Sequence, residues 1–158
     1  MMKVEIVSYS NKYSKYFYEL NYDWLNEFFY VEEYDEQVLR NCKSEIIDKG
    51  GYIFFALNNS QVVGTMALIL KENGIYELNK MAVKKDLRGN GIGHQLIQYI
   101  IDYSIDKNFK SIILYSNTVL KNSIHLYKKF GFNEIDNPDA PYKRSDIKME
   151  LKLSNFRK

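Results

Sequence analysis

The sequence predicts a single α/β domain, built on a mixed, mostly antiparallel sheet of about seven strands with about four flanking helices. Apolar residues recur at helical spacing in the first 50 residues. From residue 52, three stretches rich in β-branched and aromatic residues follow one another across short turns. After them, helical segments alternate with short apolar stretches. A chain of 158 residues with 46% hydrophobic residues fits one core.

The N-terminal segment predicts a strand followed by a helix. Residues 3–9 alternate apolar and polar side chains, which is typical of a strand. Ser10 and Asn11 are residues that cap helices, so we expect a helix from there to about Phe29. Its apolar face is expected to hold Tyr13, Phe17, Leu20, Trp24 and Phe28.

A second helix is expected from about Asp35 to the glycine pair at residues 50 and 51. Lys49 followed by glycine is typical of a helix C-terminus. The apolar positions of this helix are Val38, Leu39, Ile46 and Ile47.

The middle and the end of the chain predict the rest of the sheet. Residues 52–57, 62–70 and 75–83 should form an antiparallel meander, because only short turn signals separate them. The later elements are expected in this order: a polar loop at 84–90, a helix at 91–107, a strand at 111–115, a helix at 122–130, and strands at 132–135 and 147–153.

Composition disfavours several classes of function. The formal net charge is +2 and the charges are interspersed, which is not the pattern of a nucleic-acid binder. Cys42 is the only cysteine, and His94 and His125 lack ligand-like spacing, so we expect no metal site and no intramolecular disulfide. Residues 1–10 do not resemble a signal peptide, and no apolar run is long enough to span a membrane. We therefore expect a cytoplasmic protein with no membrane partner.

The most informative stretch is a loop with three alternating glycines, Gly89, Gly91 and Gly93. Glycine permits positive φ and close backbone approach, so successive N–H groups can converge on an anion such as pyrophosphate. The N-terminus of the helix that follows adds free N–H groups. The loop is not a Walker loop, because no Gly-Lys-Ser/Thr follows the glycines. It is not the dinucleotide fingerprint G-x-G-x-x-G either, which would need glycine in place of His94. A glycine-rich turn without a ligand is the alternative.

At this point the chain resembles the GNAT superfamily of N-acetyltransferases. Residues 88–93 match the signature R/Q-x-x-G-x-G/A at every fixed position, and residues 77–83 look like the family's fourth strand. Residues 122–132 resemble the second motif, Asn-x-x-Ala-x-x-Leu/Phe-Tyr-x-x-x-Gly-Phe, with Ile124 at the alanine position. Residues 142–151 resemble the last strand. The likeness is strong from about residue 62 onward and weak before residue 52.

The resemblance implies one N-acetyltransferase domain over residues 1–158. Residues 1–50 would form the variable acceptor-side helices, residues 52–136 the cofactor-binding core and residues 146–153 the C-terminal strand. Acetyl-CoA would be the cosubstrate, and its acetyl group would pass directly to a primary amine. Transfer of a longer acyl group, or a non-catalytic acyl-CoA-binding sensor or interaction module, are the alternatives. The acceptor stays open, and homodimers, common in the family, are one oligomeric state open to the chain.

The resemblance also implies residue roles. The backbone of Met81 and Val83 would pair with the pantetheine arm, and an amide near Val83 would polarise the thioester carbonyl. Asn122 would bind the coenzyme arm, and Tyr127 would protonate the leaving thiolate. The implied cofactor-binding residues are Met81, Ala82, Val83, Arg88, Gly89, Asn90, Gly91, Ile92, Gly93, His94, Asn122 and Tyr127.

Two catalytic residues are expected, Tyr127 as general acid and Glu77 as general base. A lysine-like amine has a pKa of about 10.4, so it must lose a proton before it attacks. For Glu77, the alternatives are a water chain as base and a solvent-facing position on its strand. Tyr127 shares a helix face with Ile124 and Phe130, so packing alone is its alternative.

Two further groups lie where the family places its acceptor. The acidic group could attract a cationic amine or simply form a solvated helix entry; it comprises Glu32, Glu33, Asp35 and Glu36. The aromatic group should divide between the core and an acceptor pocket; it comprises Tyr22, Trp24, Phe28, Phe29 and Tyr30. His94 is interpreted as a phosphate-side contact or a solvated residue, and Cys42 and His125 as ordinary helix residues.

Overall fold

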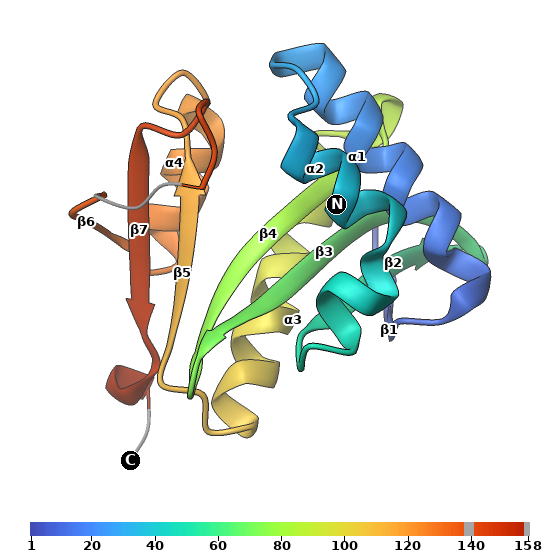
Figure 1. The fold of residues 1–158 in the computed structure, drawn as a ribbon. Helices are drawn as coiled ribbons and strands as arrows, with labels where there is room; N and C mark the ends of the chain where they lie inside the picture. Colours follow the sequence, from blue (N-terminus) through green and yellow to red (C-terminus); the bar gives the residue numbers. More distant parts are fainter. Residues whose placement is uncertain (138–140, 157–158) are drawn as a thin grey trace.

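The order of elements is the predicted one. The structure is a computed structural model that describes residues 1–137 and 141–156. Figure 1 shows the elements along the chain. They are β1 (Glu5–Ser8), α1 (Ser14–Phe28), α2 (Glu33–Arg40), β2 (Tyr52–Asn58), β3 (Gln61–Glu72), β4 (Ile75–Val83), α3 (Ile92–Asp106), β5 (Ser111–Ser116), α4 (Lys121–Lys129), β6 (Asn133–Ile135) and β7 (Ile147–Lys152).

Within the described residues, the strands form one sheet of seven in the order β1-β2-β3-β4-β5-β7-β6. The meander β2-β3-β4 is antiparallel, as predicted, and β4 and β5 are parallel. Their pairing joins only residues 75–77 to residues 111–113 in the described part of the chain. Beyond that point the two strands diverge, as Figure 1 shows. The edge of β4 from residue 78 to residue 83 is therefore left without a strand partner on that side.

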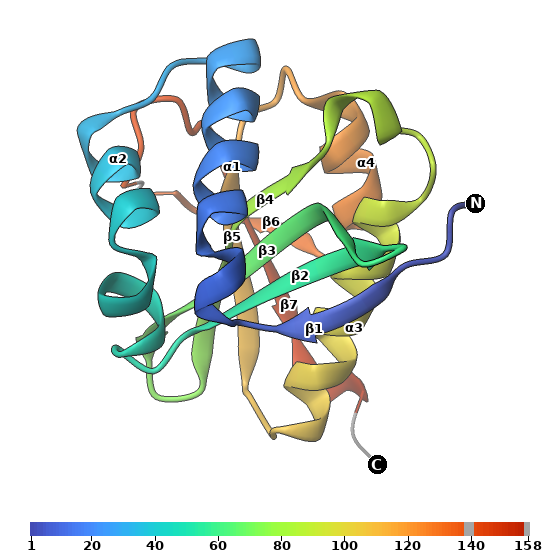
Figure 2. The same cartoon turned by 90° about the vertical axis from the view of Figure 1, so that its right-hand side faces the viewer.

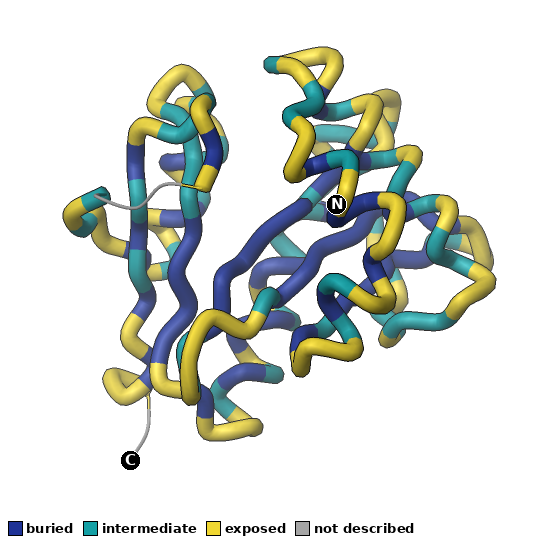
Figure 3. Tube along the Cα trace, in the orientation of Figure 1, coloured by how far each residue is buried: buried dark blue, intermediate teal, exposed yellow. Residues whose placement is uncertain are grey.

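Both faces of the sheet are covered, which explains why β2 is apolar almost throughout. Ile53 and Phe55 belong to one apolar cluster with Phe17 of α1. Phe54 belongs to a second cluster that includes Leu96 of α3. Figure 2 shows α1 and α3 on opposite faces, and Figure 3 shows that the central strands are the most buried part of the chain.

A β-bulge distorts β4 next to the place where β4 leaves β5. Thr65 pairs with Ala82 and Ala67 with Asn79, so two residues of β4 stand opposite one residue of β3. One of the two is Lys80, whose φ is +53°. Residues other than glycine rarely adopt this left-handed backbone conformation. A bulge also bends the strand in which it occurs.

The first predicted helix differs from the structure in its start and in its buried face. Ser10 makes no side-chain cap hydrogen bond, and the first turn is a 3₁₀ turn at Asn11–Tyr13. The fully buried residues of α1 are Phe17, Asn21 and Leu25. Leu20 and Trp24 are partly buried and pack against the same apolar cluster as Phe17, as expected, whereas Phe28 is 42% exposed. Trp24 and Phe28 also line the groove described below.

The second predicted helix is divided into two parts. The α-helix begins at Glu33, where Asp35 Oδ2 accepts a hydrogen bond from the Glu32 N–H group at 3.0 Å, and it ends at Arg40. A π-helical turn at Lys43–Ile47 follows it. In the part of the chain that the structure describes, no helix combines the length and apolar character needed to cross a membrane.

Candidate functional site

A groove runs along the unpaired edge of β4. It has a volume of about 740 Å³ and lies between β4, the glycine loop, α1 and α4. Met81, Ala82 and Val83 line it. Ala82 is only 1% exposed, whereas its neighbours Met81 and Val83 are partly exposed and are the positions of β4 that a ligand can reach. An extended molecule in this groove could pair with the strand as an added strand does.

The glycine loop forms one end of the groove. Gly89 and Gly91 have φ values of +82° and +80°, in the region that favours glycine. A Cβ atom at Gly89 or Gly93 would meet no atom within 4 Å, so the space over the loop is open. Because α3 begins at Ile92, the first N–H groups of that helix lie beside this space. The arrangement suits an anion.

The other expected cofactor residues divide between the groove and the loop scaffold. Arg88, Ile92, His94 and Asn122 line the groove. Asn90 does not: its side-chain Nδ2 donates to the Leu87 carbonyl oxygen at 2.9 Å, which fixes the loop from within.

Arg88 ties the glycine loop to α1. Its Nη1 atom lies 2.9 Å from Glu27 Oε2, and its guanidinium lies over the Phe28 ring. His94, by contrast, packs its ring 4.8 Å from that of Phe130. The groove wall is therefore partly apolar and partly charged.

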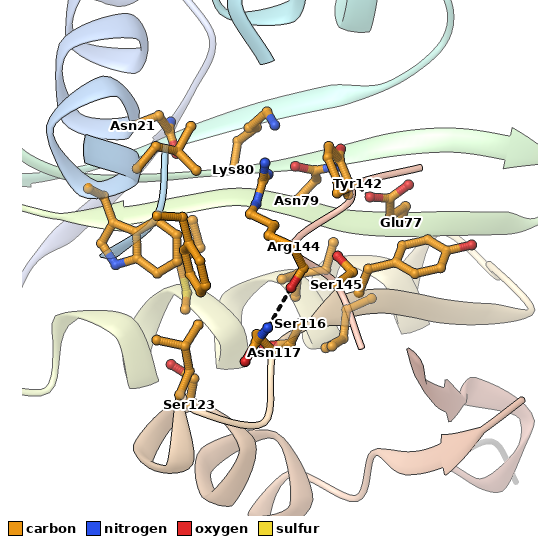
Figure 4. A pocket seen from close by; sticks show the side chains of 18 of the residues that line it. Asn21, Glu77, Asn79, Lys80, Ser116, Asn117, Ser123, Tyr142, Arg144 and Ser145 are labelled. Atoms are coloured by element: carbon orange, nitrogen blue, oxygen red, sulfur yellow. Dashed lines mark hydrogen bonds between the residues drawn. The ribbon is translucent and has the colours of Figure 1, made fainter. Parts of the chain in front are cut away.

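A second cavity continues the groove between β4 and β5. Its volume is about 110 Å³, and Trp24, Met81, Leu120 and Ser123 line both spaces. Figure 4 shows its polar side chains converging from α1, β4, β5 and the segment before β7. They include Asn21, Glu77, Asn79, Lys80, Ser116, Asn117, Tyr142, Arg144 and Ser145, and Ser123 joins them from α4.

Glu77 lies in this second cavity and is 2% exposed, so the reading that it faces solvent is wrong. Lys71 Nζ lies 3.4 Å from its Oε1 atom. Asn79 Nδ2 donates hydrogen bonds to Glu77 Oε2 and to the Tyr142 hydroxyl. Burial raises the pKa of Glu77, and the charges of Lys71 and Lys80 oppose this rise. A carboxyl group with a raised pKa is a better base than an ordinary one.

Tyr127 lies in the same cavity, so the structure brings both expected catalytic residues together. Its ring packs 5.9 Å from that of Phe132, which agrees with a packing role as well as a chemical one. Burial raises the pKa of Tyr127 to about 12. The phenol is therefore protonated throughout the neutral range and can act as a hydrogen-bond donor.

A buried ion network forms the wall of the cavity nearest α2. Asp35 is 0% exposed and accepts hydrogen bonds from Lys80 Nζ and from both terminal nitrogens of Arg144, the latter at 2.6 and 3.0 Å. Arg144 Nη1 also lies 3.0 Å from Glu32 Oε2. Burial would raise the pKa of Asp35, but the hydrogen bond from Arg144 and the charge of Lys80 outweigh it and lower the pKa.

The solvated reading of the acidic group holds for Glu33, which is exposed, but not for Asp35. Asp35 is an internal counter-ion and not part of a solvated helix entry. Glu32 pairs with Arg144, and Glu36 pairs with Arg40 on the surface. These three carboxylates already have cationic partners within the chain, so they are poorly placed to attract a cationic amine.

Lys80, Tyr142 and Arg144 were not predicted as site residues. One signal was available for Lys80, because Glu77, Asn79 and Lys80 stand close together in a mainly apolar strand and buried polar groups need partners. Nothing local marks Arg144, whose partner Asp35 is 109 residues away in the sequence.

Other titratable residues give no further site. Cys42 is buried and unpaired, and burial raises the pKa of its thiol, so it is an inert core residue. In residues 1–137 and 141–156, no group of three or more His, Cys, Asp or Glu side chains is placed to hold a metal ion.

Comparison with known proteins identifies the fold family. A profile described as "Acetyltransferase (GNAT) family" matches residues 4–132. The chain belongs to the GNAT family. N-acetyltransferase 8B from Rattus norvegicus is 31% identical to this GNAT protein over 97 residues, which cover 58% of this chain and 44% of that protein. The chain thus spans less than half the length of that relative.

Solved structures show the same GNAT fold. A GNAT-family acetyltransferase from Staphylococcus aureus Mu50 has a TM-score of 0.85 at 24% identity, over 96% of this chain and 99% of that one. The PaiA N-acetyltransferase from Thermoplasma acidophilum, solved with coenzyme A, has a TM-score of 0.75 at 21% identity, again over 96% and 99%.

The ion network predicts how Asp35→Asn affects stability. The change leaves Lys80 and Arg144 without their buried counter-ion, so the free energy of unfolding should fall by about 3–5 kcal/mol at neutral pH. Because the pKa of Asp35 is lowered by folding, its contribution is present above the unfolded-state pKa and is lost as pH falls through the folded-state value. The difference between variant and wild type in urea unfolding should therefore shrink below about pH 4.

The matched control is Glu36→Gln, which removes a surface carboxylate from the same helix. It should cost less than about 1 kcal/mol. Equal effects of the two substitutions at neutral pH would contradict the role given to Asp35.

Proposed function

We propose that this protein is an N-acetyltransferase that moves the acetyl group of acetyl-CoA directly onto a primary amine. One observation carries the proposal. The groove along the free edge of β4 opens into a cavity that contains both Glu77 and Tyr127. A cosubstrate held in the groove would present its thioester where the two spaces join, beside Met81 and Ser123.

The groove would hold the cofactor largely through backbone groups. The pantetheine arm would pair with residues 81–83, and the N–H groups of the glycine loop and of α3 would bind the pyrophosphate. Asn122 of α4 would hydrogen-bond the arm from the opposite wall. The coenzyme A complex of the Thermoplasma acidophilum protein, which shares this fold, supports the choice of cofactor.

The cavity would hold the acceptor. Asn21, Trp24 and Phe29 come from the first 50 residues and line it, which supports an acceptor-side role for that region. Glu77 would take the proton of the amine, directly or through one water, because its raised pKa brings it closer to neutrality. The amine nitrogen then forms its bond to the thioester carbon as the carbon–sulfur bond breaks.

Tyr127 would stabilise the departing thiolate. A thiol has a pKa of about 8.5, whereas that of Tyr127 is about 12, so complete proton transfer to sulfur is uphill by about 5 kcal/mol. A hydrogen bond from the neutral phenol lowers the energy of the thiolate without that cost. Tyr127 is then a hydrogen-bond donor to the leaving group. The attacking nitrogen loses its second proton as the amide forms, and the departed thiolate takes up that proton.

A non-catalytic acyl-CoA sensor or interaction module is the alternative. Such a protein would need the groove but would not need a buried carboxyl and a buried phenol in an adjoining cavity. The presence of Glu77 and Tyr127 in one space therefore supports catalysis.

Tyr127→Phe tests the catalytic role. We expect kcat to fall about 10²- to 10⁴-fold, because the thiolate loses its donor, while the affinity for acetyl-CoA changes little. Release of the coenzyme A thiol in the presence of an amine library would measure kcat, and calorimetric titration would measure the affinity for acetyl-CoA. Tyr99→Phe, a tyrosine of α3 outside both cavities, is the control. Unchanged turnover in Tyr127→Phe would exclude Tyr127 as the donor.

Glu77→Gln tests the base. In the wild type, kcat/KM should rise with pH as Glu77 ionises, at a pKa above the ordinary carboxyl value of about 4.3. In the variant this acidic limb should vanish, and kcat should fall at least about 10²-fold. Glu72→Gln, at the exposed end of β3, should leave the profile intact. If the Glu77→Gln variant keeps both its kcat and the acidic limb of the pH profile, Glu77 is not the base, and a water chain would take the proton of the amine instead.

A further inference from the structure

Arg144 lines the cavity but has no role in the chemistry above, and one edge of its guanidinium has no hydrogen-bond acceptor among the described residues. We propose that the acceptor is a small amino acid or a close analogue, whose carboxylate binds this edge. The inference rests on the proposed function and narrows its acceptor to amines that also carry a carboxylate.

The hydrogen bonds of Arg144 can be counted atom by atom. A guanidinium has five N–H groups in a fixed plane. Asp35 accepts one from Nη1 and one from Nη2, and Glu32 accepts the second from Nη1. The N–H of Nε and the second N–H of Nη2 stay without an acceptor among the described residues. In a guanidinium these two N–H groups are parallel, and together they form a fork that a carboxylate can bind through two parallel hydrogen bonds.

The fork is held in place before any ligand arrives. Asp35 fixes the far edge of the guanidinium, and the Tyr142 ring lies 4.3 Å from its central carbon. The backbone is fixed too, because Asn117 Nδ2 donates to the Arg144 carbonyl oxygen at 2.6 Å. Figure 4 shows this bond and shows the Arg144 side chain rising toward Lys80 and Asn79. A group held in this way loses little freedom on binding, which favours affinity.

The charges of the cavity favour the same class of acceptor. Among the described residues that line it, Glu77 is the one acid, whereas Lys80 and Arg144 are cations. A polyamine would need several unpaired carboxylates, and Asp35 and Glu32 are already used by these two cations. A molecule with one amine and one carboxylate suits the pair formed by Glu77 and the Arg144 fork.

The first test compares matched acceptors on the wild-type protein. Each of the twenty amino acids is assayed beside its carboxamide and its decarboxylated amine, with spermidine included, by thiol release from acetyl-CoA. We expect the best amino acid to exceed both of its analogues by at least about tenfold in kcat/KM, because the analogues leave the fork unpaired. A better rate with the carboxamides, the simple amines or spermidine, or no turnover of any amino acid, overturns the inference.

The second test uses Arg144→Lys, which keeps a cation beside Asp35 but removes the fork. The preference for the amino acid over its carboxamide should fall at least about tenfold, mainly through a higher KM. Arg40→Lys, which alters a surface arginine of α2, should keep the preference. Retention of the preference in folded Arg144→Lys contradicts the inference, and the wild-type comparison decides it if that variant does not fold.

These experiments distinguish failure of the carboxylate inference from failure of the proposed function. If simple amines are acetylated and amino acids are not, the carboxylate inference is lost and the acetyltransferase proposal stands. If acetyl-CoA does not bind, the proposed function itself is lost.

Discussion

The geometry of the site depends on one buried carboxylate, Asp35. It lies on α2 and binds Lys80 in the bulge of β4 and Arg144 in the segment before β7. Buried charges are costly unless they are paired, so this carboxylate constrains three distant parts of the chain at once. Its partner Lys80 has a left-handed backbone conformation, which residues other than glycine rarely adopt, and lies in the bulge of β4. The ion pair with Asp35 thus lies at the point where β4 is distorted.

The divergence of β4 and β5 produces both functional spaces. Strand edges are normally paired or protected, and here the edge of β4 is left open to a groove that ends in a glycine loop. The buried acid Glu77 and the cations Lys80 and Arg144 lie in the cavity between the strands. In the proposed function, the cofactor and the acceptor would therefore use different parts of the same split sheet.

The elements that depend on interactions between residues close in sequence, namely the meander and the glycine loop, were predicted from local sequence patterns. Turn signals and β-branched runs predicted the meander. The spacing of Gly89, Gly91 and Gly93 predicted a loop that uses the positive φ open to glycine, which Gly89 and Gly91 adopt, and its use as an anion site stays a prediction. Glu77 and Tyr127 were chosen through family resemblance, and the structure adds that they share a cavity.

Features that depend on contacts distant in sequence were not predictable. The burial of Asn21 on α1 was missed for a local reason, because its side chain donates a hydrogen bond to the Phe17 carbonyl oxygen one turn earlier, which apolar spacing does not reveal. Phe28, on the predicted apolar face, is 42% exposed beside the groove. The acidic group looked solvated because its cationic partners, Lys80 and Arg144, come from β4 and from the segment before β7. Ion pairs between such distant segments leave no periodic signal in the sequence.

The most direct test of the central claim is thermal unfolding with and without acetyl-CoA, with NADH and ATP as controls. Acetyl-CoA at about a hundred times its dissociation constant should stabilise the fold by about 2.7 kcal/mol. For a domain of this size, that should raise the midpoint by about 5 °C or more. Gly93→Ala, whose added methyl group would enter the groove, should show a smaller shift. A shift with acetyl-CoA and not with the controls is the predicted result, and no shift at saturating acetyl-CoA would contradict the account.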